Sequence, residues 1–338
     1  MKLIIPMAGI GKRMRPHTLT VPKPLLPVAG KPMVQHLIED IAATIKGQIE
    51  EIGFVIGHFG KEVEENLLAV AKKMGARGRI FYQEEALGTA HAVMCAKDML
   101  KGSVVVAFAD TLFRGEFTVD TSHEGIIWVQ KVEDPRPFGV VKLDKHNIIT
   151  EFVEKPQEFV SDLAIIGIYY FKDGEYLKSE MQYLLDNDIK EKGEYQLTNA
   201  LENMKRKGTK FSVAQISEWL DCGSKANMLH TNKRLLETKT FPKQSSVQLI
   251  NTTIIEPCCI AKNTIIKNSV IGPHVSIGAN NTIENTKISD SILRHDCRIV
   301  NATITESMIG SNVEYNGKQE QSSGKQDRLN LGDYNQVN

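Results

Sequence analysis

A regular spacing of isoleucine in the last third of the chain limits its possible folds more than any other feature. Isoleucine recurs at six-residue steps and later mostly at five-residue steps, at Ile254, Ile260, Ile266, Ile271, Ile277, Ile283, Ile288, Ile299, Ile304 and Ile309. A six-residue period with a β-branched residue at each start is typical of a parallel β-helix, in which flat-sided coils stack these residues inward. At roughly 16 to 18 residues per coil, residues 248–315 predict about four coils.

The composition changes after Phe241-Pro242, where helix-forming stretches give way to Ile, Val, Asn, Thr, Ser and Gly. A chain of 338 residues is long enough for roughly two domains. We therefore expect one domain over residues 1–240 and the β-helix over residues 241–338. The polar stretch at 316–327 predicts a mobile loop. Leu329–Asp333 resembles one more repeat, which predicts that the chain returns to the β-helix after that loop.

The first 235 residues alternate short apolar runs with segments of helical period, which predicts an α/β domain with a mostly parallel, mixed sheet covered by helices. The predicted strands are Leu3–Pro6, Ile52–Ile56, Arg79–Tyr82, Val104–Ala109, Ile126–Val132, Ile148–Val153 and Ile165–Phe171. One helix is predicted to begin at Pro32 and carry apolar residues every four positions up to Ile45. A second, over Val63–Met74, is predicted to end at Gly75.

Charge and composition exclude several classes of protein. Lys plus Arg number 41 and Asp plus Glu number 41, so the net charge of 41 − 41 = 0 argues against nucleic acid as a partner. We expect no membrane span, because no apolar run reaches about 18 residues. Lys and Arg follow the short apolar stretch at the N-terminus, so we expect no signal peptide and a cytoplasmic protein. The five cysteines lack CxxC spacing, which indicates neither a disulfide framework nor a zinc site.

A glycine-containing loop follows the first predicted strand, with the sequence AGIGKRMRP at residues 8–16. Glycines after a strand let backbone N–H groups approach a phosphate, and neighbouring cations add charge. A dinucleotide fingerprint would need glycine where Met14 stands, and a Walker loop would need Ser or Thr where Arg13 stands. Further on, Lys23 lies among prolines that stiffen the backbone.

Together these segments resemble the signature of the sugar-1-phosphate nucleotidylyltransferases, also called sugar-nucleotide pyrophosphorylases. The signature is AGIGKRMRPHTLTVPKPLLPVAGKPM, and further matches follow in the family's order: YQEEALGTAHAV, FADTLF, FGVVKLD, FVEKP, GIYYF, GEYQLTNA and WLDCG. The resemblance implies a Rossmann-like nucleotidyltransferase domain and a left-handed β-helix. The closest type is a glucose-1-phosphate thymidylyltransferase or uridylyltransferase, which joins a sugar 1-phosphate to the α-phosphate of a nucleoside triphosphate and releases pyrophosphate.

The chemistry of this reaction fits the residues of the loop. The attacking phosphate oxygen is ionised near neutral pH, since its second pKa is about 6, so no general base is required. Crowded negative charge must instead be neutralised by cations and a metal. The resemblance implies that Arg13 stabilises charge at the α-phosphate, Lys23 contacts the phosphates and Lys155 holds the sugar phosphate. It implies nucleotide binding by Ala8, Gly9, Gly11, Lys12, Gln83 and Gly88.

Two carboxylates complete the expected site. Asp110 follows an apolar strand at the end where open α/β sheets bind ligands, and Asp221 lies in WLDCG. The resemblance implies that both hold Mg²⁺, a hard ion that prefers oxygen ligands. It also implies sugar contacts at Gly139, Glu154 and Gly167. The amide of Gln83 can pair with the imide edge of thymine or uracil through one donor and one acceptor, which favours dTTP or UTP.

Two other functions remain open from the sequence. The chain could be a catalytically silent regulatory homologue, although Arg13, Lys23, Asp110 and Asp221 are all present. The β-helix could add acyl transfer, with His274 or His295 as base, although it is short for this and has no recognisable acyl-donor loop. We expect every substrate contact to lie before residue 225 and the β-helix to form a homo-oligomer.

Overall fold

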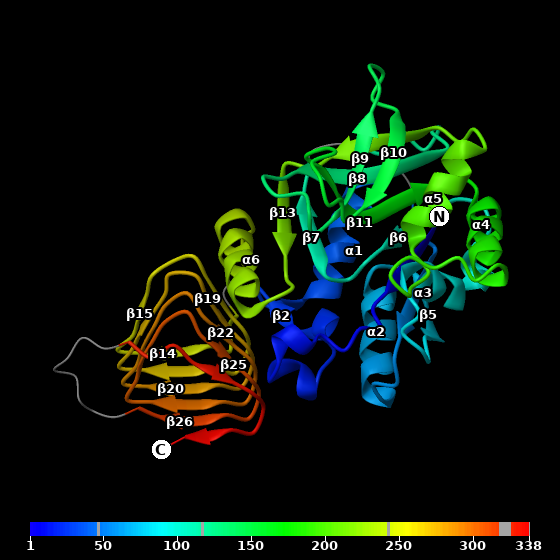
Figure 1. Ribbon diagram of the computed structural model, residues 1–338. Coiled ribbons are helices and arrows are strands. Elements are labelled where there is room, and N and C mark those ends of the chain that lie inside the picture. Colours follow the sequence, from blue (N-terminus) through cyan, green and yellow to red (C-terminus); the bar gives the residue numbers. More distant parts are fainter. Residues whose placement is uncertain (46–47, 116–117, 242–243, 318–325, 338) are drawn as a thin grey trace. The chain divides into compact units, whose positions relative to one another are not determined.

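The computed structural model describes residues 1–45, 48–115, 118–241, 244–317 and 326–337, which group into two compact units (Figure 1). Unit 1 consists of Met1–Gly9 and Val34–Trp219, and unit 2 of Ile10–Met33 and Leu220–Asn338. The loop that carries Arg13 and Lys23 therefore groups with the C-terminal part of the chain. The division of the sequence at residue 240 stays a prediction, because a catalytic domain can include residues from both compact units.

Unit 1 is built on a nine-stranded sheet with the order β10-β9-β11-β6-β1-β4-β5, to which β8 is added beside β11, and β12 beside β8. Strand β1 is parallel to β4 and β6, whereas β11 is antiparallel to β6, β8 and β9, so the sheet is mixed as predicted. The strands are β1 (Lys2–Pro6), β4 (Glu51–Ile56), β5 (Arg77–Tyr82), β6 (Val104–Ala107), β8 (Gly125–Lys131), β9 (Gly139–Leu143), β10 (Ile149–Glu154), β11 (Leu163–Phe171) and β12 (Phe211–Gln215).

All seven predicted strands are present, with ends that differ by one or two residues. The predicted helix start at Pro32 is wrong, because Pro32 pairs with Pro27 in a short antiparallel ribbon of β2 (Pro27–Val28) and β3 (Lys31–Pro32).

The helices are α1 (Met33–Thr44), α2 (Lys61–Lys73), α3 (Thr89–Cys95), α4 (Gly174–Asp186), α5 (Leu197–Arg206) and α6 (Lys225–Thr238). Helix α2 ends before Gly75, whose φ of 75° lies in the left-handed region, as predicted. The remaining elements are β7 (Thr111–Arg114), β13 (Glu218–Asp221) and four 3₁₀ turns, η1 (Lys12–Met14), η2 (His17–Leu19), η3 (Lys23–Leu25) and η4 (Lys97–Met99).

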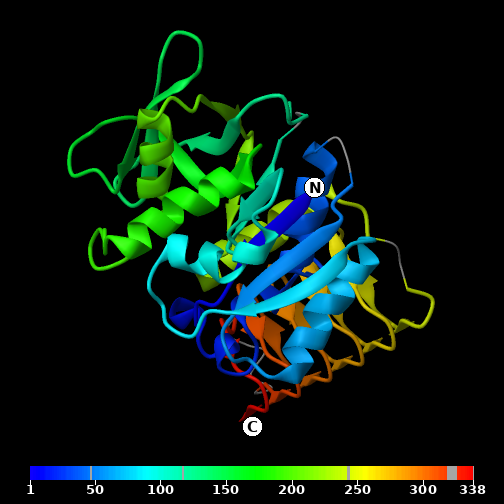
Figure 2. The same ribbon diagram turned by 90° about the vertical axis from the view of Figure 1, so that its right-hand side faces the viewer.

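The C-terminal part of unit 2 is a parallel β-helix of three sheets, drawn from yellow to red in Figure 2. One sheet has the order β14-β17-β20-β23-β26-β28, another β15-β18-β21-β24 and the third β16-β19-β22-β25-β27. Their bounds are β14 (Gln248–Ile250), β15 (Thr253–Ile254), β16 (Cys258–Ile260), β17 (Ile265–Lys267), β18 (Val270–Ile271), β19 (Val275–Ile277), β20 (Thr282–Glu284), β21 (Lys287–Ile288), β22 (Ile292–Leu293), β23 (Arg298–Val300), β24 (Thr303–Ile304), β25 (Met308–Ile309), β26 (Glu314–Asn316), β27 (Asn330–Leu331) and β28 (Gln336–Val337).

The spacing of isoleucine sets the register between coils. Ile266 pairs with Ile283, and Ile283 pairs with Ile299, and all three side chains are fully buried in one cluster. Asparagines with positive φ turn a corner of each coil, and Asn268 donates from its amide to Asn285 at 3.3 Å. The predicted return of the chain is confirmed by the pairing of β27 with β25. Most of the predicted mobile loop, at 318–325, lies outside the described residues.

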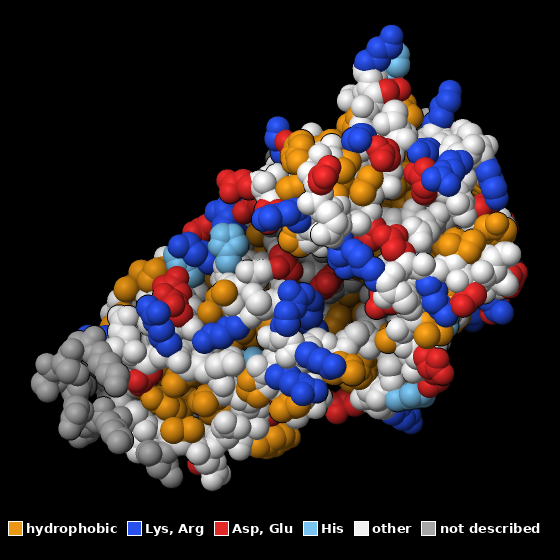
Figure 3. Space-filling view, in the orientation of Figure 1, with side chains coloured by type: hydrophobic (Ala, Val, Ile, Leu, Met, Phe, Trp, Pro, Cys, Tyr) orange, Lys and Arg blue, Asp and Glu red, His pale blue; other side chains and the backbone are white. Residues whose placement is uncertain are grey.

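The surface carries no large field of one sign on the face shown in Figure 3, where Lys and Arg side chains are interspersed with Asp and Glu. This agrees with a net charge of zero. The five cysteines are free thiols. Over the part of the chain that the structure describes, no helix has the length and apolar content needed to cross a membrane.

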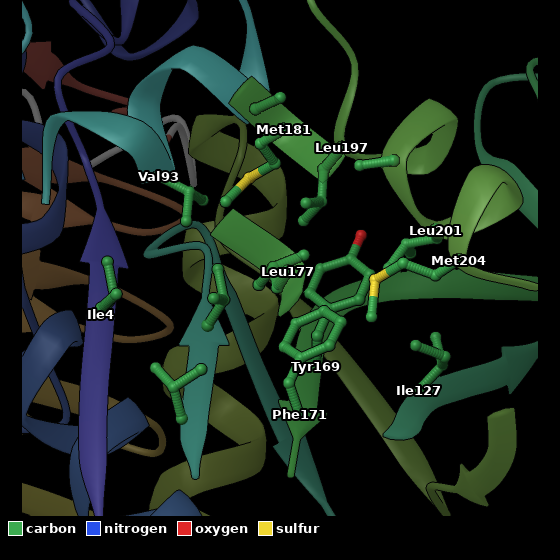
Figure 4. Packing of buried hydrophobic residues seen from close by; sticks show 14 of the residues in the cluster. Ile4, Val93, Ile127, Tyr169, Phe171, Leu177, Met181, Leu197, Leu201 and Met204 are labelled. Atoms are coloured by element: carbon green, nitrogen blue, oxygen red, sulfur yellow. The ribbon is translucent and has the colours of Figure 1, made fainter. Parts of the chain in front are cut away.

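Helices α3, α4 and α5 pack on one face of the unit 1 sheet and fix the segments that precede them (Figure 4). Tyr169 and Phe171 of β11 contact this layer, and the helices contribute the buried residues Val93, Leu177, Met181, Leu197, Leu201 and Met204. Burying each aliphatic side chain stabilises the fold by about 1.5–3 kcal/mol. The loops that enter α3 and α5 are thereby held against a rigid layer.

Candidate functional site

The loop after β1 begins at the switch point of the sheet. Strand β1 lies between β4 and β6, so the chain connections run to opposite sides of it. Ligands of open α/β sheets bind outside the carboxyl ends of the strands at such a point. Ala8 and Gly9 lie two and three residues after the end of β1, and a Cβ added to Gly9 would have no atom within 4 Å. Asp110 is exposed and follows β6, the neighbouring parallel strand.

Gln83 follows β5 at the same edge, and its side-chain amide is held by two groups of unit 1. Nε2 of Gln83 donates to the carbonyl oxygen of Gly88 at 3.3 Å and lies 3.1 Å from Nδ1 of His91. The carbonyl can only accept, so Nε2 and not Oε1 must face it. Burial holds the pKa of His91 below its ordinary value, so its neutral Nδ1 can accept the second N–H. This leaves Oε1 of Gln83 as the group that can receive a hydrogen bond from a ligand.

The segment around Gly88 is locked to the GEYQLTNA segment. Gly88 has φ of 111°, and a Cβ there would come within 2.6 Å of the carbonyl oxygen of Tyr195. Tyr195 donates its backbone N–H to Leu87 at 2.8 Å, and Leu197 donates to the hydroxyl of Thr89 at 2.8 Å. Only glycine fits at position 88. Two segments that match motifs of the family in the sequence thus hold each other in place.

Glu154 and Lys155 lie at the end of β10. Gly139 of β9 pairs with Glu154, and a Cβ at Gly139 would come within 3.0 Å of Oε2 of Glu154. Nζ of Lys155 lies 3.7 Å from Oε1 of Glu154. Burial raises the pKa of Glu154, and the Lys155 ammonium partly offsets this rise. Lys155 has φ of 44°, a conformation that costs about 1–2 kcal/mol for a non-glycine residue and is found at functional sites.

Gly167 and Tyr169 of β11 lie near Phe108, Asp110 and Glu154. Gly167 has φ of 84° and packs against the side chain of Phe108, whose backbone N–H donates to Gly167 at 2.9 Å. Burial raises the pKa of Tyr169, and the negative charges of Glu154 and Asp110 add to this effect. The phenol therefore stays protonated. Unit 1 brings together the predicted residues Asp110, Gly139, Glu154, Lys155 and Gly167 along β6, β9, β10 and β11.

The remainder of the phosphate loop lies in unit 2 and folds around Gly11. Gly11 has φ of 65°, and Thr18 donates its hydroxyl to the carbonyl oxygen of Gly11 at 2.9 Å. A Cβ at Gly11 would lie 3.1 Å from Cβ of Lys23, so these two residues are in contact across the loop. Lys23 is 8% exposed, whereas Lys12 and Arg13 are exposed. The loop therefore presents two exposed cations beside one that is buried.

The side-chain ends of Arg13 and Asp221 both lie next to Gly223 within unit 2. A Cβ at Gly223 would lie 2.9 Å from Oδ1 of Asp221 and 3.2 Å from Nη2 of Arg13. The backbone N–H of Gly223 donates to Oδ1 of Asp221 at 2.7 Å, and Asn227 donates its amide to Oδ2. The absence of a side chain at Gly223 leaves room for the guanidinium of Arg13 and for the carboxylate of Asp221. The sequence did not single out Gly223 or Asn227, although the WLDCG motif contains the glycine.

The donor set for a divalent metal is limited. No group of three or more His, Cys, Asp and Glu side chains is arranged as a metal site within the described ranges. A pair of carboxylates fits Mg²⁺, which keeps several waters and takes one or two protein carboxylates with substrate phosphates. Asp110 is exposed at a strand end, and each oxygen of Asp221 retains a lone pair beyond its hydrogen bond. The chemistry of these residues therefore fits the ion.

A family model described as nucleotidyl transferase matches residues 2–238. The chain belongs to this family. The match covers the sheet, the phosphate loop, and the segments that carry Gln83, Asp110, Lys155 and Asp221. The predicted resemblance and the predicted type of enzyme are confirmed.

Relatives of this nucleotidyl transferase cover between 91% and 100% of its length. A low-salt glycan biosynthesis nucleotidyltransferase of Haloferax volcanii is 29% identical, with 92% of each chain covered. A glucose-1-phosphate thymidylyltransferase of Streptomyces antibioticus is 29% identical over 100% of this chain and 99% of its own. A bifunctional protein GlmU of Methanococcus maripaludis is 29% identical over 91% of this chain and 81% of its own. The solved structure of a UDP-glucose pyrophosphorylase with UDP-glucose aligns with a TM-score of 0.58 at 21% identity, over 70% of this chain and 99% of that one, and supports the fold alone.

Proposed function

We propose that this chain transfers a nucleotidyl group from dTTP or UTP to glucose 1-phosphate and releases pyrophosphate. The observation that carries the proposal is the edge of the sheet at β1 and β6, where a phosphate loop, Asp110 and an oriented Gln83 follow parallel strands. A relative named as a glucose-1-phosphate thymidylyltransferase covers the whole chain and supports this choice of substrates.

The reaction needs alignment and charge neutralisation. An oxygen of the sugar phosphate attacks the α-phosphorus, the bond from that phosphorus to the bridging oxygen of the β-phosphate breaks, and pyrophosphate leaves with the electron pair. The attacking oxygen is already ionised, so no protein base takes a proton. Arg13 and Lys23 bind the triphosphate and offset the charge that builds up on the leaving group. Lys155 binds the sugar phosphate, and Glu154 and Gly139 contact the sugar hydroxyls.

The base is selected by the orientation of Gln83. Because both N–H groups of its amide face protein acceptors, Oε1 accepts from the ring N–H of thymine or uracil. The sequence predicted that the Gln83 amide pairs with the base through one donor and one acceptor. Only the acceptor, Oε1, remains for the base. Adenine and cytosine have a lone pair at the equivalent ring nitrogen and would face Oε1 with repulsion. Guanine has an N–H there, so exclusion of GTP must rest on the size of the purine.

We assign the metal to Asp110 and Asp221. Mg²⁺ held by these carboxylates would neutralise charge on the triphosphate. Asn227 and the backbone of Gly223 orient the Asp221 carboxylate for this role. Arg13, which is proposed to bind the same phosphates, also lies next to Gly223.

Acyl transfer by the β-helix is the weaker candidate, although a relative carries the name bifunctional protein. His274 lies 3.3 Å from Oε1 of Glu237 and 3.0 Å from Oδ1 of Asp290. His295 lies 2.6 Å from Oδ2 of Asp296 and 3.0 Å from Oγ of Ser311. Both ring nitrogens of each histidine thus have protein partners, which is how structural histidines are held.

We also propose that the β-helix forms a homo-oligomer. Leu249, Ile250 and Ile255 of the first coil are each more than 40% exposed, although Leu249 pairs with Ile266, which is fully buried. Light scattering of the full chain against an Ile250→Ser variant tests this proposal, and equal masses would contradict it.

The proposed reaction is tested by its products. The full chain is incubated with Mg²⁺, glucose 1-phosphate and dTTP or UTP labelled at the α-phosphate, and the products are separated by mass. We expect the label in a nucleoside diphosphate glucose, with one pyrophosphate released for each. Absence of labelled sugar nucleotide with every sugar 1-phosphate tried would overturn the proposal and favour a catalytically silent homologue.

A further inference from the structure

The phosphate loop is hydrogen-bonded to the last coil of the β-helix, and both belong to unit 2. Thr20 donates its hydroxyl to Oδ2 of Asp333 at 2.7 Å. The ring Nε2 of His17 lies 3.0 Å from Oδ1 of Asn330. These contacts join residues 313 positions apart in the sequence. They lie between Arg13 and Lys23, the two cations assigned to the triphosphate.

Asp333 is itself held rigidly by the β-helix. Its Oδ1 accepts from Nη1 of Arg294 at 2.7 Å and from the backbone N–H of Ser311 at 2.8 Å. The side chains of Arg294 and Asp333 are 9% and 6% exposed, so this ion pair is nearly buried. A buried, charge-assisted pair fixes its members in one geometry. Oδ2 of Asp333, which accepts from Thr20, is therefore held in one position.

His17 is anchored in a similar way. Its side chain is 1% exposed, and the side-chain carbonyl oxygen of Asn330 can only accept, so Nε2 of His17 carries the hydrogen. Beside it, a Cβ added to Gly332 would lie 3.0 Å from Cβ of Pro16. The C-terminal segment Leu329–Asp333 thus touches the loop at three residues, Pro16, His17 and Thr20.

We propose that the segment Leu329–Asp333 is a positioning element for the phosphate loop, with Asn330 and Asp333 as its positioning residues. This inference rests on the proposed function of the loop. It gives the β-helix a part in catalysis that goes beyond assembly. The division of roles expected from the sequence therefore does not hold for this loop, since its shape depends on residues more than 300 positions away.

A pair of substitutions at Thr20 tests the proposal in the full chain. Thr20→Val removes the hydroxyl and leaves the contacts of Asp333 with Arg294 and Ser311 in place, whereas Thr20→Ser keeps the hydroxyl. We expect Thr20→Val to lower kcat/KM for the nucleoside triphosphate about three- to tenfold, with KM for the sugar phosphate changed less. We expect Thr20→Ser to stay within about twofold of the unchanged protein.

Asn330 provides the same test from the side of the β-helix. Asn330→Ala leaves the buried Nε2–H of His17 without its acceptor, and Asn330→Asp restores an acceptor. The matched control is Asp327→Asn, since Asp327 also lies in the last coil but accepts from Tyr315 at 2.8 Å. We expect Asn330→Ala to lower kcat/KM about tenfold, Asn330→Asp to recover most of it, and Asp327→Asn to leave kcat/KM unchanged.

Hydrogen exchange separates this inference from the proposed function. We expect backbone amides of residues 11–23 to exchange faster in Thr20→Val and Asn330→Ala, and not in Asp327→Asn. The wild-type chain could make no sugar nucleotide while residues 11–23 exchange faster in both variants. That result would support the hydrogen bonding of the loop to the last coil and overturn the proposed function. Unchanged exchange and unchanged kcat/KM in both variants of an active chain would overturn the positioning role. Equal losses in Asp327→Asn would do so as well, because the effect would then be general to the coil.

Discussion

Nε2 of Gln83 lies 3.1 Å from Nδ1 of His91, and the same nitrogen donates to Gly88. In the proposed site, this relationship leaves Oε1 of Gln83 as the atom that faces the nucleotide base. We expect Gln83→Ala to raise KM for dTTP or UTP about tenfold with little change in kcat, because contact with the base changes little during transfer. The ratio of kcat/KM for UTP to kcat/KM for CTP should also fall in Gln83→Ala. Gln182→Ala, an amide of α4 bonded to Asp186, is the control. An unchanged UTP-to-CTP ratio in Gln83→Ala would contradict the assignment.

Asp110 gives a test of the metal assignment. Asp110→Asn removes a charge from the proposed site at the end of β6 and should lower kcat by about 100-fold or more. The melting temperature should change little, because Asp110 is exposed. Asp98→Asn changes another exposed carboxylate of unit 1 and should leave kcat unchanged. Near-normal turnover of Asp110→Asn at saturating Mg²⁺ would mean that Asp110 is only a turn residue.

Gly223 tests the arrangement of Arg13 and Asp221. The methyl group of Gly223→Ala would push on the ends of both side chains, which can move without unfolding the chain. We expect a loss of about tenfold or more in kcat/KM, with a melting temperature close to that of the unchanged protein. Kinetics and thermal unfolding of the same preparation check this. Full activity of Gly223→Ala would indicate that activity does not depend on the positions of the Arg13 and Asp221 side chains next to residue 223.

Much of the fold follows from the sequence, because strands and β-helix coils have strong periodic patterns. Ile266 and Ile283 could be predicted as stacked core residues from their spacing alone. The contact of Thr20 with Asp333 could not, since no periodicity relates a loop to the coil on which it rests. Position 223 was missed for a related reason, as its meaning depends on Arg13, which is more than 200 residues away. The role of His91 as a partner of Gln83 also depends on a turn at Gly88 that has φ of 111°.

The buried His17 predicts a dependence of stability on pH. Burial is the largest cause that holds its pKa below the ordinary value, and the charge of Arg294 adds to this, while Asn330 acts in the opposite sense. Below about pH 6.5 the unfolded chain binds a proton that the folded chain excludes, so the free energy of unfolding falls as the pH falls. We expect the melting temperature to drop between about pH 7.5 and about pH 5.5, and to drop less in His17→Gln.

The exposed His146 is the control for this measurement. His146→Gln changes an exposed side chain and leaves His17 and its surroundings in place, so it should keep the pH dependence of the wild-type protein. Equal slopes of melting temperature against pH for the unchanged protein and His17→Gln would show that His17 does not contribute.

Pyrophosphate release from a matrix of nucleoside triphosphates and sugar 1-phosphates tests the central claim most directly. The full chain is assayed with dTTP, UTP, GTP, CTP and ATP against glucose 1-phosphate and several other sugar 1-phosphates in the presence of Mg²⁺. We predict release with dTTP or UTP and glucose 1-phosphate, at a kcat/KM at least about tenfold above that for CTP or ATP. Release that does not depend on any sugar 1-phosphate, or a preference for ATP, would contradict the account.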